Sequence, residues 1–237
     1  MKRIFITRKL PPVAEELLRD KGYEVDVSVK NGVLTKDELI SALEAKPYDA
    51  VLSLLTDTID DDVFAAAPQA KIFANYAVGF NNINLEAAKE RGVIVTNTPD
   101  VLTDTVAEHT FALMLSLASR IAEGDRFVRA GRFNGWAPFL LLGIDIKGKT
   151  LGILGAGRIG SRVAHMANRG FDMNIIYYDI VRNNVLEENY NAKYCATVEE
   201  VLSQADIVSL HVPLIPYTRH LINKEKLEMM KKTALLV

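Results

Sequence analysis

The sequence is poor in cysteine: Cys195 is the only one among 237 residues. A single cysteine excludes an internal disulfide and leaves no second thiol at metal-ligand spacing, so we predict no metal site. An isolated cysteine is most often a small buried apolar residue, and we expect Cys195 in the core. A chain without a disulfide framework is typical of a reducing compartment, which indicates a cytoplasmic protein.

Long apolar runs and an excess of one charge are also missing. No stretch approaches the roughly 18 apolar residues of a membrane span. The N-terminus MKRIFIT has too few consecutive apolar residues to form the apolar core of a signal peptide. The net charge of −2 gives no electrostatic footprint for nucleic acid or a membrane surface. The apolar fraction of 49% and charged fraction of 24% are those of a globular protein with one large or two ordinary domains.

A glycine-rich turn stands where a strand should meet a helix. The β-rich run Thr150–Leu154 leads directly into Gly155-Ala156-Gly157-Arg158-Ile159-Gly160, and helical apolar spacing follows. In the GxGxxG pattern Gly155 permits the tight turn, Gly157 lets the backbone approach a pyrophosphate, and Gly160 lets the helix pack close to the strand. The helix N-terminus then favours an anion.

An acidic residue at the end of the next strand supports the same interpretation. The strand Asn174–Tyr178 is closed by Asp179, which lies 19 positions after Gly160 (179 − 160). A carboxylate there can accept hydrogen bonds from the ribose hydroxyls and would repel a 2′-phosphate, so NAD is favoured over NADP. Arg182 is the one feature that could weaken this preference. The alternative is an ordinary strand-to-helix turn followed by a surface aspartate.

Strands and helices alternate along the chain, which predicts two doubly wound parallel-sheet domains of the α/β class. The first, residues 1–98, is flavodoxin-like, with a capping box at Thr35-Lys36-Asp37-Glu38. The second, residues 99–237, is a dinucleotide-binding domain. Thr103–Arg129 is predicted to be one long helix that bridges domains or packs on a partner subunit. The expected strands are Arg3–Thr7, Tyr23–Val29, Ala50–Leu55, Lys71–Tyr76, Val93–Thr96, Leu151–Leu154, Asn174–Tyr178, Lys193–Cys195, Asp206–Val212 and Ala234–Val237.

Several stretches in a fixed order resemble the D-isomer-specific 2-hydroxyacid dehydrogenases, and among them most closely the glyoxylate and hydroxypyruvate reductases. The matching stretches are Asn75–Asn84 (NYAVGFNNIN), Val95–Asp104, Thr105–His109, Gly135–Gly143, Lys147–Gly160 and His211–Ile222 (HVPLIPYTRHLI). The resemblance covers essentially the whole chain. It implies hydride transfer between nicotinamide and a small 2-oxo or D-2-hydroxy acid, in a homodimeric oxidoreductase.

The resemblance also implies the site residues. The backbone amides of Val78 and Gly79 would bind the substrate carboxylate, where glycine permits close approach. His211 would lie on the adenosine side of the cofactor rather than act as the general acid. The expected NAD-binding residues are Thr105, Gly155, Gly157, Arg158, Ile159, Gly160, Asp179, His211, Val212, Pro213 and Thr218.

The catalytic residues of the family have no counterpart in this chain. The family's arginine follows the strand that matches Ala234–Val237, and its glutamate and histidine lie further on. We therefore predict a fragment that is truncated before these residues, that lacks the returning segment of the first domain, and that is inactive alone. A naturally short, inactive relative is the other interpretation. Alternatives to a glyoxylate or hydroxypyruvate reductase are D-lactate dehydrogenase, 3-phosphoglycerate dehydrogenase and a catalytically inactive dinucleotide-binding module.

Overall fold

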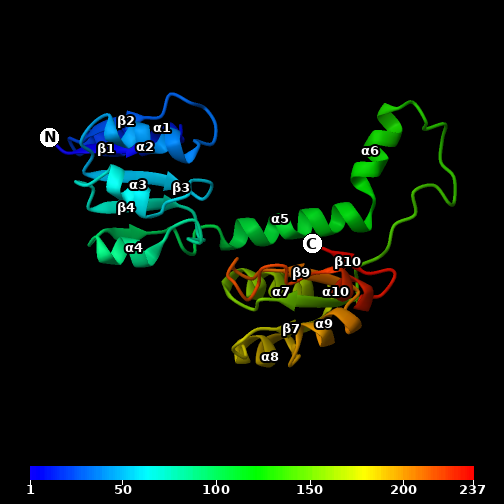
Figure 1. The fold of residues 1–237 in the computed structure, drawn as a ribbon. Helices are drawn as coiled ribbons and strands as arrows, with labels where there is room; N and C mark the ends of the chain where they lie inside the picture. Colours follow the sequence, from blue (N-terminus) through cyan, green and yellow to red (C-terminus); the bar gives the residue numbers. More distant parts are fainter. The chain divides into compact units, whose positions relative to one another are not determined.

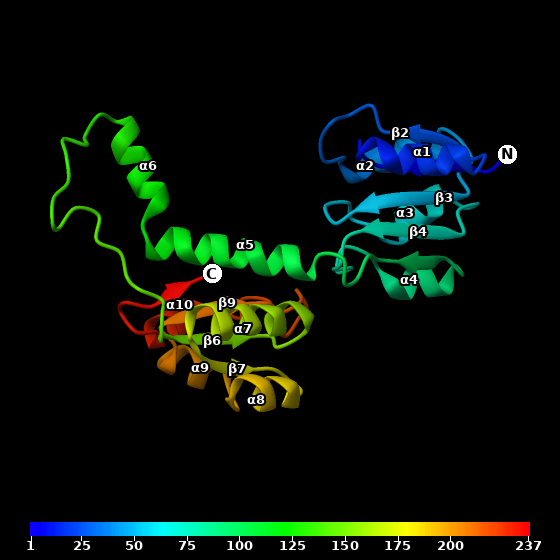
Figure 2. The same cartoon turned by 180° about the vertical axis from the view of Figure 1, so that it is seen from behind.

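The computed structural model describes residues 1–237, which form two compact units, Met1–Val101 and Leu102–Val237. Each unit is built on a five-stranded parallel sheet with helices against it (Figures 1 and 2). The predicted α/β class with two doubly wound sheets is therefore confirmed. The assignment of residues 1–98 to substrate and 99–237 to cofactor stays a prediction. No helix is both long and apolar enough to cross a bilayer.

The first unit has the strand order of a flavodoxin-like sheet, β2-β1-β3-β4-β5, with every pair parallel. Its order reverses between β1 and β3, and the carboxyl ends of those strands are where such folds bind ligands. The elements are β1 (Arg3–Ile6), α1 (Pro12–Asp20), β2 (Glu24–Val27), α2 (Lys36–Glu44), β3 (Ala50–Leu54), α3 (Asp61–Ala66), β4 (Ile72–Tyr76), α4 (Leu85–Glu90) and β5 (Ile94–Thr96).

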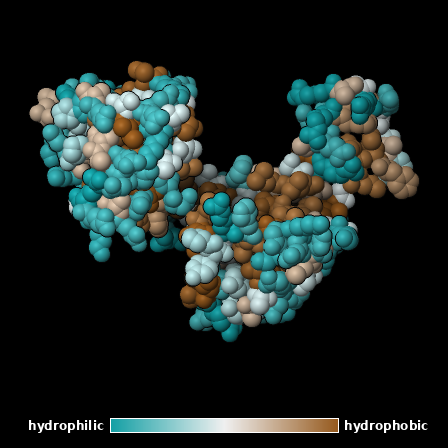
Figure 3. Space-filling view, viewed as in Figure 1, coloured by the Kyte–Doolittle hydropathy of each residue, from teal (hydrophilic) through white to brown (hydrophobic).

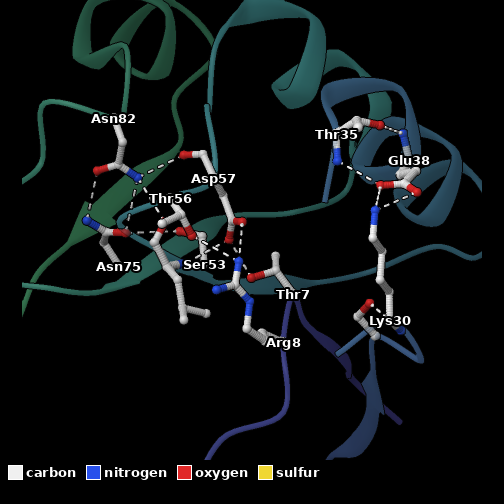
Figure 4. Close-up of polar contacts among 12 residues, drawn as sticks. Thr7, Arg8, Lys30, Thr35, Glu38, Ser53, Thr56, Asp57, Asn75 and Asn82 are labelled. Carbon is white, nitrogen blue, oxygen red and sulfur yellow. Dashed lines mark hydrogen bonds and ion pairs between the residues drawn. The ribbon is translucent and has the colours of Figure 1, made fainter. Parts of the chain in front are cut away.

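Helices cover both faces of this sheet (Figures 1 and 2). Helix α1 packs on one face around Ile6 and Val25, whereas α2, α3 and α4 pack on the other around Phe64 and Phe73. The predicted capping box is present: Glu38 N donates to Thr35 Oγ1 over 3.2 Å, and Thr35 N donates to the Glu38 carboxylate over 2.8 Å. Figure 4 shows this cap together with Lys30, whose ammonium pairs with Glu38.

The second unit has the strand order β10-β9-β6-β7-β8, all parallel. If β6 to β10 are numbered 1 to 5 and the sheet is read from β8, this is the 3-2-1-4-5 arrangement of a dinucleotide-binding sheet. The strand order reverses between β6 and β9. The elements are α5 (Thr103–Ala118), α6 (Ile121–Arg129), β6 (Thr150–Leu154), α7 (Arg158–Phe171), β7 (Asn174–Tyr178), α8 (Asn184–Tyr190), β8 (Lys193–Tyr194), α9 (Val198–Gln204), β9 (Ile207–Leu210), α10 (Lys224–Met229) and β10 (Leu235–Leu236).

Two apolar layers enclose the second sheet. Helices α5, α7 and α8 pack on one face around Met114, Val163 and Leu186, and α9 packs on the other around Val201. Cys195 belongs to the α9 layer and is fully buried, as expected from its isolation in the sequence. Burial raises the pKa of its thiol, so it behaves as an inert apolar group.

The predicted single helix Thr103–Arg129 is wrong, because two helices, α5 and α6, occupy this range. Arg120 between them has a left-handed backbone with φ +53°. The carbonyl of Ala118 accepts a hydrogen bond from Ile144 N over 2.9 Å, so it is engaged by the returning loop at the end of α5. The Arg120 guanidinium then pairs with Glu123 in the first turn of α6.

Candidate functional site

The glycine turn joins β6 to α7 and is shaped by contacts that only glycine permits. Gly155 has φ +96°, and a Cβ there would lie 2.7 Å from the carbonyl oxygen of His211. A Cβ on Gly160 would lie 2.1 Å from the carbonyl oxygen of Gly155, so α7 starts directly against the turn. A Cβ on Gly157 would meet nothing within 4 Å. The turn is thus closed at Gly155 and Gly160 and open at Gly157, the exposed N-cap residue of α7.

Asp179 lies beside this turn at the carboxyl end of β7. Its Oδ2 accepts a hydrogen bond from Ala156 N over 2.7 Å, and its Oδ1 accepts a longer one from Val181 N at 3.4 Å. The Ala156 carbonyl is in turn held by Asn183 Nδ2 over 2.8 Å. The carboxylate is therefore fixed by one oxygen and keeps the other weakly bonded and available for a hydroxyl donor.

A cavity of about 570 Å³ opens at the carboxyl ends of β6, β7 and β9. This is the reversal point of the sheet, where open α/β folds bind their ligands, and the volume is ordinary for a cofactor pocket. The cavity brings together seven of the eleven predicted cofactor residues: Gly155, Gly157, Asp179, His211, Val212, Pro213 and Thr218.

The loop after β9 forms one wall of this cavity and is braced by its own side chains. Thr218 Oγ1 accepts from Ile215 N over 2.9 Å and donates to the Pro213 carbonyl. His211 Nε2 lies 2.9 Å from Ser209 Oγ. Burial lowers the pKa of His211 to about 4, so the imidazole is neutral at pH 7. A neutral ring contributes a wall and a hydrogen bond but has no imidazolium proton to donate.

Four predicted cofactor residues do not line the cavity. Arg158, Ile159 and Gly160 form the start of α7, where Gly160 is buried beneath the turn. Thr105 is exposed in the first turn of α5, next to Asp104, which pairs with Arg162 of α7.

Sequence reasoning missed most of the apolar wall, since its members are separated in the chain and carry no motif. The missed wall residues are Tyr178, Ile180, Val198, Ile215, Tyr217 and Leu221.

The shape and polarity of this site fit a dinucleotide. The open side of Gly157 is space that any larger residue would fill, at a helix N-terminus that favours a pyrophosphate. Asp179 offers an acceptor for ribose hydroxyls, and the apolar walls suit a flat base. No group of three histidine, cysteine or acidic side chains is placed to hold a metal ion.

In the first unit, Val78 and Gly79 follow β4 in a loop that asparagine side chains hold in place. Asn97 Nδ2 donates to the Val78 carbonyl over 2.8 Å, and Asn75 Nδ2 donates to the Gly79 carbonyl over 2.9 Å. All peptide bonds are trans, so the Gly79 N–H points opposite to the Val78 carbonyl, away from Asn97. The orientation of this amide is therefore fixed by the protein before any ligand binds.

A buried polar network supports that loop at the reversal point between β1 and β3 (Figure 4). Asp57 is 1% exposed and accepts hydrogen bonds from Thr7 Oγ1 over 2.5 Å and from Leu54 N over 2.8 Å. Asn82 Nδ2 donates to the carbonyls of Leu54 and Asp57 at 3.1 and 3.0 Å. The network ties the turn after β3 to the Val78–Gly79 loop through the Asn75–Asn82 side-chain contact of 3.2 Å.

Comparison with known proteins agrees with this geometry. Residues 111–237 match the NAD-binding domain of the D-isomer specific 2-hydroxyacid dehydrogenases. Over 239 aligned residues the chain is 47% identical to glyoxylate reductase of Aeropyrum pernix, covering 99% of this chain and 70% of that protein. The chain belongs to the D-isomer specific 2-hydroxyacid dehydrogenases. Its cofactor is NAD, and its reaction class is the interconversion of 2-oxo and 2-hydroxy acids.

Solved structures of the family share the fold over the whole chain. D-lactate dehydrogenase from Aquifex aeolicus, complexed with NAD and lactic acid, is 28% identical with a TM-score of 0.83 and covers 99% of this chain and 68% of its own. A glyoxylate reductase from Paecilomyes thermophila is also 28% identical, with a TM-score of 0.82, covering 99% of this chain and 72% of its own.

Proposed function

We propose that this dehydrogenase acts on glyoxylate, and that the cavity at the carboxyl ends of β6, β7 and β9 binds the adenosine and pyrophosphate of NAD. The observation that carries the cofactor assignment is Asp179, fixed by Ala156 N beside the open Gly157. The substrate assignment is supported by the 47% identity to the glyoxylate reductase of Aeropyrum pernix over 99% of this chain. Bound NAD supplies the nicotinamide that exchanges a hydride with the substrate.

The residues described above would bind and orient the substrate and the cofactor. The Gly79 amide, whose direction is set by the Asn97–Val78 bond, would hold the substrate carboxylate. His211 is neutral at pH 7 with a pKa of about 4 and is not proposed as the acid. The cytoplasmic location stays a prediction.

The test of the cofactor assignment is fluorescence titration of the chain with NADH and with NADPH. We expect NADH to bind more tightly, and Asp179→Ala to lower the NADH-to-NADPH preference at least about tenfold, because the charge that repels a 2′-phosphate is removed. Asp145→Ala deletes an exposed carboxylate elsewhere in the same unit and serves as the control. An unchanged ratio in Asp179→Ala would remove this residue from the site. Subsequent addition of glyoxylate tests turnover of the proposed substrate.

We also propose that the chain forms a homodimer through α5, α6 and the loop that follows. Figure 3 shows apolar side chains gathered over α5 and the base of α6. Leu113 and Leu117 are 46% and 49% exposed, and Trp136 and Phe139 in the loop are 84% and 86% exposed. An apolar surface of this extent is typical of a protein interface.

Sedimentation of the purified chain tests this assembly. We expect twice the mass of one chain, and Leu117→Asp should shift the distribution towards monomer, because an interface core does not tolerate an unpaired charge. Leu17→Asp is the matched control, since Leu17 is a comparably exposed leucine on α1 in the first unit. A monomer at all concentrations in the unmodified chain would reject the proposal.

A further inference from the structure

Arg182 is the cation nearest in sequence to the carboxylate that would meet the ribose. It follows Asp179 by three residues, in the loop between β7 and α8. An arginine at this distance could bind a 2′-phosphate and oppose the NAD preference that Asp179 creates. The structure shows where its guanidinium goes.

The guanidinium is held by two partners, Glu187 of α8 and Tyr194 of β8. Nε donates to Glu187 Oε1 over 3.1 Å and Nη2 donates to Glu187 Oε2 over 2.6 Å, a two-point pairing. Its carbon also lies 5.1 Å from the ring centre of Tyr194, within cation–π range. Tyr178, Asp179 and Ile180 of the same segment line the cofactor cavity, but Arg182 does not.

Glu187 is itself fixed by a buried side chain. Tyr177 is fully buried, and its hydroxyl donates to Glu187 Oε1 over 2.6 Å while accepting from Asn183 N over 2.8 Å. The hydrogen bonds from Arg182 and Tyr177 lower the pKa of Glu187, so it is ionised at pH 7. The acceptor is therefore already in position, on helix α8, before any cofactor arrives.

We propose that Glu187 is a positioning residue for cofactor selectivity: with Tyr194 it restrains Arg182 and withholds that cation from the 2′-phosphate of NADP. This inference rests on the proposed cofactor site. Selectivity then has two parts. Asp179 repels the 2′-phosphate, and Glu187 restrains Arg182, the only cationic side chain between β7 and α8.

Glu187→Gln tests the restraint, because glutamine keeps the shape and can accept from Tyr177 but loses the charge that binds Arg182. In fluorescence titrations of the full chain, we expect NADPH affinity to rise roughly threefold to tenfold, since an exposed arginine pair is modest and a phosphate is a strong alternative partner. NADH affinity should change less than about twofold, since NADH carries no 2′-phosphate. An unchanged NADH-to-NADPH ratio would overturn the inference.

Two further variants separate the restraint from other effects. In Arg182→Gln/Glu187→Gln the gain in NADPH affinity should disappear; if it persists, removal of the Glu187 charge acts directly and Arg182 is not the agent. Asp125→Asn breaks the comparable Arg129–Asp125 pair on α6 and should leave both affinities unchanged. If the unmodified chain binds neither dinucleotide, the proposed cofactor site fails and this inference fails with it. If NADH binds as proposed and Glu187→Gln keeps the ratio, only this inference fails.

Discussion

Replacing Gly157 by valine is expected to weaken NADH binding at least about 100-fold while the chain stays folded. The fold should tolerate the valine because a Cβ at this position meets nothing within 4 Å in the protein itself, and Gly157 has an ordinary φ of −73°. The added side chain would fill the space at the start of α7 where a pyrophosphate must approach the backbone amides. Fluorescence titration with NADH measures the loss, and circular dichroism reports the fold.

Gly170→Val is the matched control for this variant. Gly170 lies near the other end of the same helix, and a Cβ there also meets nothing within 4 Å. It is remote in sequence from the turn, so Gly170→Val should bind NADH as the unmodified chain does. If Gly157→Val retained near-normal affinity, the glycine turn could not be the pyrophosphate site, and the cavity beside it would need another ligand.

The parallel sheets and the glycine turn could be predicted because their signals are local. Periodicity places each strand, and the constraints on Gly155 and Gly160 follow from one short segment whose geometry is nearly independent of the rest of the chain. Asp179 could be associated with the turn for the same reason, since only one helix and one strand separate them in the chain. The structure shows the contact as the 2.7 Å hydrogen bond from Ala156 N.

Features that depend on distant partners could not be predicted. The break at Arg120 involves a hydrogen bond from Ile144, which returns to Ala118 after a long loop, and the apolar pattern of α5 and α6 gives no sign of it. The cavity wall is assembled from three strand ends, and Ile180 and Ile215 look like ordinary surface residues in the sequence. The restraint of Arg182 likewise depends on Tyr177, whose hydroxyl donates to Glu187. In the sequence, the strand that carries Tyr177 shows only an apolar pattern.

Gly160→Ala is expected to lower the stability of the second unit strongly. The new Cβ would lie 2.1 Å from the carbonyl oxygen of Gly155 and 3.1 Å from the side chain of Ile153. The turn cannot move away easily, because Gly155 N is bonded to the Tyr178 carbonyl over 2.9 Å and Gly155 itself is packed against His211. We expect the free energy of unfolding to fall by about 3 kcal/mol.

Urea denaturation measures this loss, and hydrogen exchange resolved by peptide locates it. Protection should fall in β6, β7 and α7, whereas β1 and β3 of the first unit provide an internal reference. Gly170→Ala adds the same methyl group to α7 without a clash and should leave stability unchanged or raise it by up to about 1 kcal/mol, because alanine favours a helix over glycine. Equal stability of the two variants would mean that α7 does not start directly against the glycine turn.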